Sequence, residues 1–307
     1  MSKSANRGYS FEYSTIVEGQ KILNANIEPR TQTWINDKGI EKYNSITSDE
    51  QQAMLDASNA IVNFLIEYEP WIQQKETEIT YVGTIRGSND VSDVRFSNIQ
   101  NSFGVSLKSN HDAVRHPRIS PTIDIARQWL GAPTDQQYMD EIRQIIENFF
   151  SYCSYNNITR YNQLDKNKLD SILYRPVTES FALMLHRVFT KSQGSEAIAY
   201  FLGYLIGNKN FYKAKADFNN REITIEAYDI TGALGTKGRL KMPSRCHEVL
   251  VETGRNGMHN YISITFDQGW QLKMRLHNAE RNIQNSLKWD VRFIGTPHDA
   301  WSTRFTF

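Results

Sequence analysis

Apolar residues recur at helical spacing in two stretches near the start of the chain. Between residues 9 and 25 they keep this spacing with no intervening proline, which predicts an amphipathic helix. The second stretch begins at Thr47, which forms a capping-box pattern with Glu50, and continues to Pro70. Because proline does not continue a helix, we expect this second helix to end just before it.

The spacing of apolar residues becomes strand-like after Trp71. Short runs that contain Ile, Val, Phe and Tyr cover residues 79–85, 91–96 and 103–108, and Gly, Ser, Asn and Asp lie between them. Runs of this length between turn-forming residues predict the short strands of a meander.

Helical spacing returns in the middle of the chain, and alternation returns after it. The helical segments are 123–130, 136–152, 177–189 and 195–206, and the alternating ones are 223–228 and 261–266. There is neither an internal repeat nor a low-complexity linker. The pattern therefore predicts an α/β (α+β) fold in one compact unit, 1–307, with a mixed sheet flanked by helices in 1–130, a helical region in 131–215 and a strand-rich region in 216–307.

The composition is that of a folded globular protein. The 307 residues are 39% hydrophobic, 22% charged and 12% aromatic, which excludes the disordered and fibrous classes. The length permits one large domain or two. No stretch approaches the roughly 18 apolar residues that span a bilayer, and the first residues lack the apolar core of a signal peptide. We therefore expect a cytoplasmic protein with no membrane partner.

Cysteine and charge narrow the possible chemistry. The two cysteines, Cys153 and Cys246, are far apart in sequence and too few for a disulfide framework or a zinc site. The formal net charge is only +1, so any contact with nucleic acid has to come from a local cluster. Residues 237–292 form such a cluster, because they include ten basic residues and only five acidic ones.

One acid and one lysine lie where neighbouring strands are predicted. Side chains alternate between the two faces of a strand, so Ser106 and Lys108 point away from the apolar Val105 and Leu107. Asp93 would lie on the adjacent strand if the two runs pair through the turn at 97–101. This arrangement is the one that PD-(D/E)xK nucleases use, in which the carboxylate holds a divalent cation and the lysine orients water. Such pairs are common in a chain of this length, so spacing alone does not assign the role.

Two longer segments resemble the HaeIII-type restriction endonucleases. Residues 92–95 (SDVR) and 104–120 (GVSLKSNHDAVRHPRIS) are similar to the DVR…G(L/I)SxKxNHxAVKHxR(L/I)S pattern of that family. Residues 269–279 (GWQLKMRLHNA) and 286–290 (SLKWD) extend the similarity through most of the chain, whereas the middle helices match only in character. The resemblance implies a type II site-specific deoxyribonuclease with its nuclease core in 1–130 and its DNA-contacting part in 216–307.

The resemblance also implies a variant of the PD-(D/E)xK site, with Asp93 and Lys108 as catalytic residues. Ser106 stands where the second acid of the pattern belongs, and a hydroxyl replaces a carboxylate poorly on a hard cation. Two residues are candidates for the missing ligand. Glu12 matches the glycine-x-x-aromatic-glutamate pattern on the first helix, and Asp124 is the alternative. Leu107 joins Asp93 and these acids among the residues expected at the metal.

The run that follows the predicted site is rich in groups that bind DNA. Arginine grips phosphate or the guanine edge, and asparagine reads a base edge. Two histidines without cysteine partners are too few for zinc, and each is equally well interpreted as a buried, hydrogen-bonded residue. With Arg95 from the preceding strand, the residues expected at the DNA are Asn110, His111, Arg115, His116 and Arg118.

Basic residues also alternate in the last third of the chain. Lys237, Arg239 and Lys241 would point to one side of a strand, as would Lys273 and Arg275, with His277 and Asn278 beside them. A stripe of this kind is often only a solvated face of a sheet. The excess of positive charge nevertheless suits a duplex backbone, so we expect these residues to contact DNA.

The predicted activity is Mg²⁺-dependent hydrolysis of double-stranded DNA that leaves 5′-phosphate ends. The resemblance implies GGCC as the target, and a palindromic site favours a homodimer on DNA. A cognate DNA methyltransferase is expected in the host, without a stable complex. Two alternatives remain open: a repair or recombination nuclease that reads DNA structure, and a non-catalytic DNA-binding protein in which Ser106 marks a decayed site.

Overall fold

The computed structural model describes residues 3–83, 90–109, 113–236, 238–294, 297 and 299–307. Its contacts divide the chain into two compact units. The first comprises residues 1–112, 207–241 and 299–307, and the second comprises 113–206 and 242–298. Within the described residues, no helix has both the length and the apolar character needed to cross a membrane.

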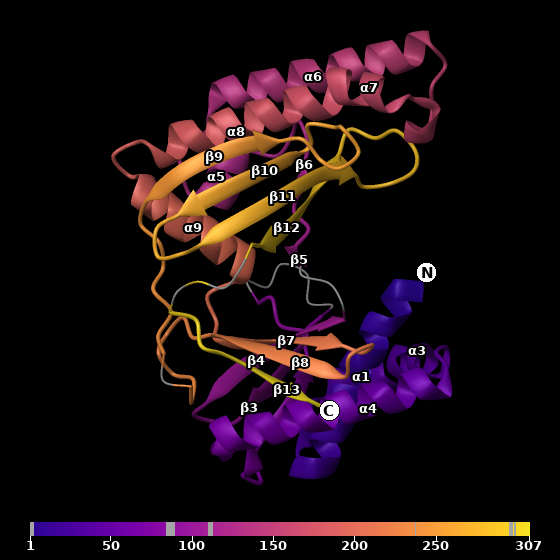
Figure 1. Ribbon diagram of the computed structural model, residues 1–307, viewed down its shortest axis with the longest axis vertical. Coiled ribbons are helices and arrows are strands. Elements are labelled where there is room, and N and C mark those ends of the chain that lie inside the picture. Colours follow the sequence, from indigo (N-terminus) through magenta and orange to yellow (C-terminus); the bar gives the residue numbers. More distant parts are fainter. Residues whose placement is uncertain (1–2, 84–89, 110–112, 237, 295–296, 298) are drawn as a thin grey trace. The chain divides into compact units, whose positions relative to one another are not determined.

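The first unit is a seven-stranded mixed sheet with helices on one face (Figure 1). The strand order is β1-β2-β3-β4-β7-β8-β13, and β1–β2 and β4–β7 are the parallel pairs. The strands are β1 (Asn26–Ile27), β2 (Glu78–Tyr81), β3 (Val94–Ser97), β4 (Ser102–Ser109), β7 (Phe211–Asp217), β8 (Glu222–Tyr228) and β13 (Ser302–Thr306). The helices are α1 (Lys3–Leu23), α2 (Pro29–Trp34), the π-helical turn η1 (Ile35–Gly39), α3 (Ile40–Asn44), α4 (Ser48–Tyr68) and the 3₁₀ turn η2 (Pro70–Gln73).

The predicted capping box forms at the start of α4. The Thr47 hydroxyl accepts from the Glu50 amide, and the Glu50 carboxylate accepts from the Thr47 amide in return. The helix ends at Tyr68, just before Pro70. Its apolar face and that of α1 bury Phe11, Ile61 and similar side chains against the sheet, and each such side chain contributes roughly 1.5–3 kcal/mol.

Alternation along β3 and β4 separates the core from the opposite face, as predicted. Val105 and Leu107 belong to the core cluster beneath the sheet. Gly104 is required at its position because a Cβ atom there would lie 2.3 Å from the side chain of Ser92. The close approach of these two backbones brings the segment before β3 against β4.

The second unit is a six-stranded antiparallel sheet packed on helices. Its order is β5-β12-β11-β10-β9, with β6 also paired to β12. The ring of Phe181 lies 5.0 Å from that of Trp289, and the ring of Phe189 lies 5.7 Å from that of Phe266, so α8 covers this sheet. The strands are β5 (Ala113–Arg115), β6 (Arg118–Ile119), β9 (Cys246–Glu252), β10 (Tyr261–Phe266), β11 (Gln271–Asn278) and β12 (Leu287–Phe293). The helices are α5 (Ile125–Leu130), α6 (Gln136–Tyr155), the 3₁₀ turn η3 (Tyr161–Gln163), α7 (Lys166–Leu169), the π-helical turn η4 (Asp170–Tyr174), α8 (Arg175–Phe189) and α9 (Gly194–Ile206).

The α/β class, the N-terminal helices, the four middle helices and the strands at 223–228 and 261–266 are confirmed. The boundaries of the two compact units differ from the predicted boundaries at residues 130 and 215. The reason is the parallel pair β4–β7, since parallel neighbours need a crossover connection. Here residues 110–210 form that connection, and all the helices described in the second unit belong to it. That the whole chain acts as one compact unit stays a prediction.

Candidate active site

Asp93 and Lys108 meet on neighbouring segments of the first sheet. Asp93 immediately precedes β3, Lys108 lies near the end of β4, and these strands pair in antiparallel fashion. The Lys108 Nζ lies 3.3 Å from the Asp93 Oδ2, and the two side chains are only 19% and 18% exposed. The structure therefore brings together the acid and the lysine that strand alternation placed on one site.

The Asp93 carboxylate is held by β4 through one of its two oxygens. The Leu107 amide donates to Oδ2 at 2.7 Å, and the Ser106 hydroxyl reaches the same oxygen at 3.5 Å. The lysine is the third donor to Oδ2, whereas Oδ1 accepts no hydrogen bond from any residue that the structure describes. This fixed carboxylate thus presents one oxygen to an electropositive ligand.

Glu12 reaches the same site from α1. Its Oε2 accepts a 2.9 Å hydrogen bond from the Tyr81 hydroxyl, and the Tyr81 ring stacks on Trp34 with ring centroids 3.8 Å apart. Burial is the main reason that the pKa of Glu12 is raised to about 8, and the negative charge of Asp93 raises it further. Tyr81, Lys108 and Lys38 lower the pKa in part. The carboxyl therefore holds a proton at neutral pH when no cation is present.

This donor set suits Mg²⁺. In the described part of the chain no three His, Cys, Asp or Glu side chains gather as a metal cluster, but Mg²⁺ binds through one or two carboxylates and keeps several waters. When Glu12 is ionised, its carboxylate and that of Asp93 repel each other, and a bound hard cation would relieve that repulsion. An extended residue directs its N–H and C=O to the same side, so the Leu107 carbonyl points to the side on which its amide meets Asp93 and could serve as a further oxygen ligand.

Asp124 has another task in the second unit. It is the N-cap of α5, where Oδ1 accepts from the Arg127 amide at 3.1 Å and Oδ2 accepts from the Thr134 hydroxyl at 2.5 Å. These bonds satisfy a helix terminus. They account for Asp124 without a metal.

Replacing Asp124 with alanine should therefore affect stability and leave DNA cleavage unchanged. Loss of an N-cap side chain costs about 0.5–2 kcal/mol of unfolding free energy. Urea unfolding and digestion of phage DNA would measure the two effects on the same sample. If the variant has normal stability but no longer cuts DNA, Asp124 would again be a candidate metal ligand.

The face of the first sheet that carries Lys108 holds more charge than the sequence analysis recognised. On β7, Lys213 pairs with Ser106 and Lys215 pairs with Lys108 of β4. On the other side of β7, Glu226 of β8 pairs with Lys213. Lys213 and Glu226 are buried, and the Lys215 Nζ lies 2.7 Å from Glu226. The alternation of lysine and alanine in residues 213–216 was the overlooked signal. It continues the positive row that begins at Lys108.

Arg95, one of the DNA-binding residues predicted in the first unit, has partners within that unit. Arg95 forms an ion pair with Asp90 and donates to the Ser102 hydroxyl at 2.8 Å, and burial lowers the pKa of its guanidinium. Arg95 thus has structural partners. Three other predicted residues, Asn110, His111 and Lys237, lie outside the described part of the chain.

The expected strand at 237–241 is wrong, because residues 238–241 form a loop. The Asp229 carboxylate accepts from the amides of Gly232, Ala233 and Leu234, and the Leu240 amide donates back to the Asp229 carbonyl at 2.8 Å. This turn closes the segment on itself. Arg239 donates to the Ile230 carbonyl, and Lys241 lies 3.3 Å from Asp299, so neither belongs to a stripe.

The other predicted stripe does lie on a strand. Lys273, Arg275 and His277 alternate along β11 with fully buried apolar residues. Lys273 forms an ion pair with Glu252, and the Arg275 guanidinium lies 3.2 Å from Asp290. The strand is confirmed, and contact with DNA stays a prediction.

The remaining predicted DNA contacts are divided between buried and exposed positions of the second unit. Burial is the main cause that lowers the pKa of His277. The Asn278 side chain accepts from the Tyr174 hydroxyl at 3.2 Å, and Arg115 lies over the Tyr204 ring at 4.2 Å. His116 lies 3.2 Å from Asp290 and is 48% exposed, and Arg118 is exposed.

Comparison with known proteins gives a consistent result across the chain. A family model described as HaeIII restriction endonuclease matches residues 8–297. The chain is 28% identical over 316 residues to the type II restriction enzyme HaeIII of Haemophilus aegyptius, a match that covers 96% of each chain. No solved structure matches. The family match includes every residue of the site built from α1, β3 and β4.

Proposed function

The chain belongs to the HaeIII restriction endonuclease family and is a type II site-specific deoxyribonuclease; from this premise we propose that Glu12, Asp93 and Lys108 hydrolyse DNA with Mg²⁺. The convergence of these three side chains, from three separate segments, carries the proposal. The helix α1 replaces the acid that is missing at Ser106. The core is thereby a PD-(D/E)xK site whose second carboxylate has moved to a helix.

Each residue has a defined task in the proposed reaction. Glu12 and Asp93 would hold the cation through carboxylate oxygens, with the Leu107 carbonyl as a further ligand. When bound, Mg²⁺ supplies Lewis acidity toward the scissile phosphate and its developing charge. Lys108 has its ammonium fixed by Asp93 at 3.3 Å and orients the attacking water. Attack in line with the leaving 3′-oxygen leaves a 5′-phosphate.

The relative supports a proposed target and partners. Because the similar protein is HaeIII, we take double-stranded GGCC as the target. A palindrome is cut symmetrically by two copies of one site, which favours a homodimer on DNA. Host DNA then needs a cognate methyltransferase, which acts separately. We place the enzyme in the cytoplasm, where its DNA substrate would be met.

Purified protein with unmethylated phage DNA should give discrete fragments with Mg²⁺ and none with EDTA. Sequencing the fragment ends identifies both the site and the terminal phosphate. A smear would favour a nuclease that reads DNA structure. Binding without cleavage at any Mg²⁺ concentration would favour a non-catalytic DNA-binding protein, and either result would contradict the proposed function.

A further inference from the structure

The turn between β9 and β10 encloses a polar pocket of about 580 Å³, here called the hairpin pocket. Its lining is largely basic and polar, and consists of Thr253, Gly254, Arg255, Asn256, Tyr261, Lys273 and Arg292. None of the catalytic residues contributes to it. The pocket therefore needs an explanation separate from the cleavage site.

The sheet supplies a cationic wall of the hairpin pocket. Lys273 on β11 is the register partner of Arg292 on β12, so both side chains project from the same face. The Lys273 ammonium lies 5.4 Å from the centroid of the Tyr261 ring and pairs with Glu252. With Arg255 from the turn, three cations line the pocket. Such a lining favours an anionic or acceptor-rich ligand.

The turn itself is compact. The Gly254 amide donates to the Met258 carbonyl at 2.8 Å, and the Gly257 amide donates to the Gly254 carbonyl at 2.9 Å. Gly257 has a φ of +83°, which favours glycine at this point of the turn. The exposed side chains of Arg255 and Asn256 are thus carried on a defined backbone.

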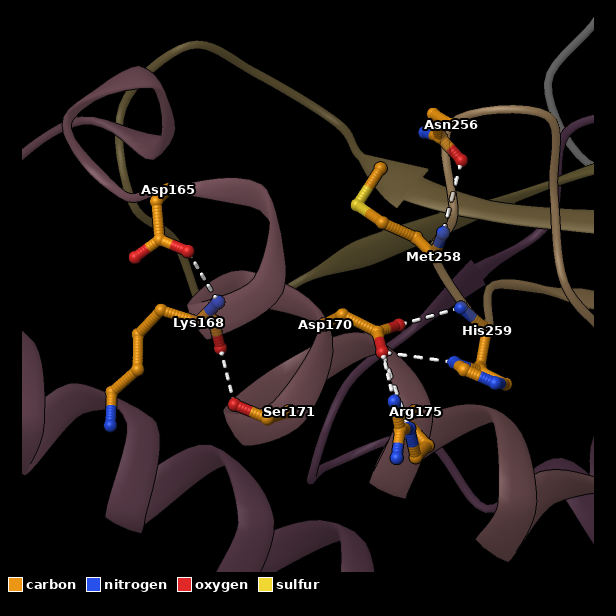
Figure 2. A network of polar contacts seen from close by, with 8 residues as sticks. All are labelled: Asp165, Lys168, Asp170, Ser171, Arg175, Asn256, Met258 and His259. Atoms are coloured by element: carbon orange, nitrogen blue, oxygen red, sulfur yellow. Dashed lines mark hydrogen bonds and ion pairs between the residues drawn. The ribbon is translucent and has the colours of Figure 1, made fainter.

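A buried carboxylate fixes the end of this turn (Figure 2). Asp170 is 3% exposed, and its Oδ1 accepts from the His259 amide at 2.6 Å. Its Oδ2 lies 3.0 Å from the His259 Nδ1 and accepts from the Arg175 Nη2 at 2.8 Å. Burial alone would raise the pKa of Asp170, but the bonds from His259 and Arg175 keep it below its usual value. The carboxylate is therefore charged and bonded on both oxygens.

The position of this anchor points to function. Asp170 begins the π-helical turn η4 between α7 and α8, and such turns are frequent at functional sites. A surface turn on antiparallel strands does not need a buried carboxylate to form. Fixing the turn before binding reduces the conformational entropy lost when Arg255 engages a ligand.

We propose that the hairpin pocket reads base pairs of duplex DNA, with Arg255 at a base edge and Lys273 and Arg292 at adjacent phosphates. The inference rests on the proposed function, which makes duplex DNA the ligand. The major groove is wide enough for a two-stranded ribbon. Arginine pairs with guanine O6 and N7, while lysine and arginine hold phosphates. A guanine-rich site would make Arg255 the dominant reader.

The test compares Arg255→Ala with the control Arg143→Ala. Arg143 is a half-exposed arginine on α6 that pairs with Asp140. Binding is measured by fluorescence anisotropy with Ca²⁺ in place of Mg²⁺. The probes are 20-base-pair duplexes that carry the site cut by the wild-type enzyme, each single-base-pair variant of that site, or no site.

Arg255→Ala should lose on the order of 10- to 100-fold in affinity for the site duplex and little for the duplex without it. Discrimination should weaken at one symmetric pair of positions, and Arg143→Ala should match the wild type. Equal losses on all duplexes, or no loss, would overturn the inference, because a phosphate contact is not selective. A wild-type enzyme that neither cuts nor prefers any sequence would instead overturn the proposed function.

Asp170→Asn tests the anchor separately. As a positioning residue, Asp170 should affect the same base-pair positions as Arg255 and by a smaller factor, in a protein that still melts cooperatively. A loss of melting temperature without any change in discrimination among the duplexes would show that Asp170 only stabilises the fold and does not position Arg255.

Discussion

Lys108→Ala should abolish DNA cleavage and leave binding to the site duplex nearly intact. Loss of a group that orients or deprotonates water lowers the rate by at least about 100-fold. Asp93 keeps its bond from the Leu107 amide at 2.7 Å, so the carboxylate should stay in place. Single-turnover cleavage at saturating enzyme measures the rate, and anisotropy with Ca²⁺ measures the binding.

The matched control for this variant is Lys21→Ala. Lys21 is also a lysine of the first unit that pairs with a carboxylate, since its Nζ lies 3.2 Å from Glu18. Lys21 lies far along α1 from Glu12, so the Lys21→Ala enzyme should cleave DNA at the wild-type rate. If Lys108→Ala cleaves at the wild-type rate, the water is positioned by another group, and Lys215 on the adjacent strand would be the next residue to replace.

Glu12→Gln should abolish cleavage and, in the metal-free protein, raise stability at alkaline pH. The pKa of Glu12 rises from 4.5 to about 8 on folding, first through burial and then through Asp93. The folded protein therefore holds a proton that the unfolded chain releases, and its stability falls as pH rises from about 4.5 to about 8. Glutamine keeps an acceptor for Tyr81 and has no charge to bury.

Thermal melting at pH 6 and pH 8.5, with EDTA and with Mg²⁺, distinguishes these effects. The wild type should lose melting temperature at the higher pH in EDTA and regain it with Mg²⁺, because cation binding favours the charged carboxylates. Glu12→Gln should show neither the loss nor the regain, and Glu67→Gln, an exposed position on α4, should behave as the wild type. Normal cleavage by Glu12→Gln would exclude Glu12 as a metal ligand.

Local patterns predicted the direction in which the Lys108 side chain points. Strand alternation at 104–108 is a two-residue period that a pleated strand imposes, so it placed Lys108 opposite the apolar pair without any tertiary information. The position of Glu12 next to Asp93 could not be predicted in this way, because periodicity shows only that Glu12 lies on a helix. Glu12 was a candidate because it matches the glycine-x-x-aromatic-glutamate pattern. The packing of α1 on the sheet brings it to Asp93.

Other features depended on contacts distant in sequence. The sequence of residues 237–241 alternates as a strand does, but residues 238–241 form a loop in which the Leu240 amide donates to the Asp229 carbonyl. Two separate contact units could not be inferred from segment order, since β7 returns to β4 across residues 110–210. The pairing of Asp170 with His259 joins residues that no local pattern relates.

The register of β13 has a consequence for how the enzyme is made. This strand, Ser302–Thr306, pairs with β8, and the ring of Trp301 packs 5.0 Å from that of Tyr68 on α4. The sheet that carries Asp93 and Lys108 thus takes strands from both ends of the 307 residues. During translation, the early strands must wait for β7, β8 and β13 to emerge, because non-local strand pairs form late. A nascent chain that stops before β7 would thus hold Asp93 and Lys108 on an incomplete sheet.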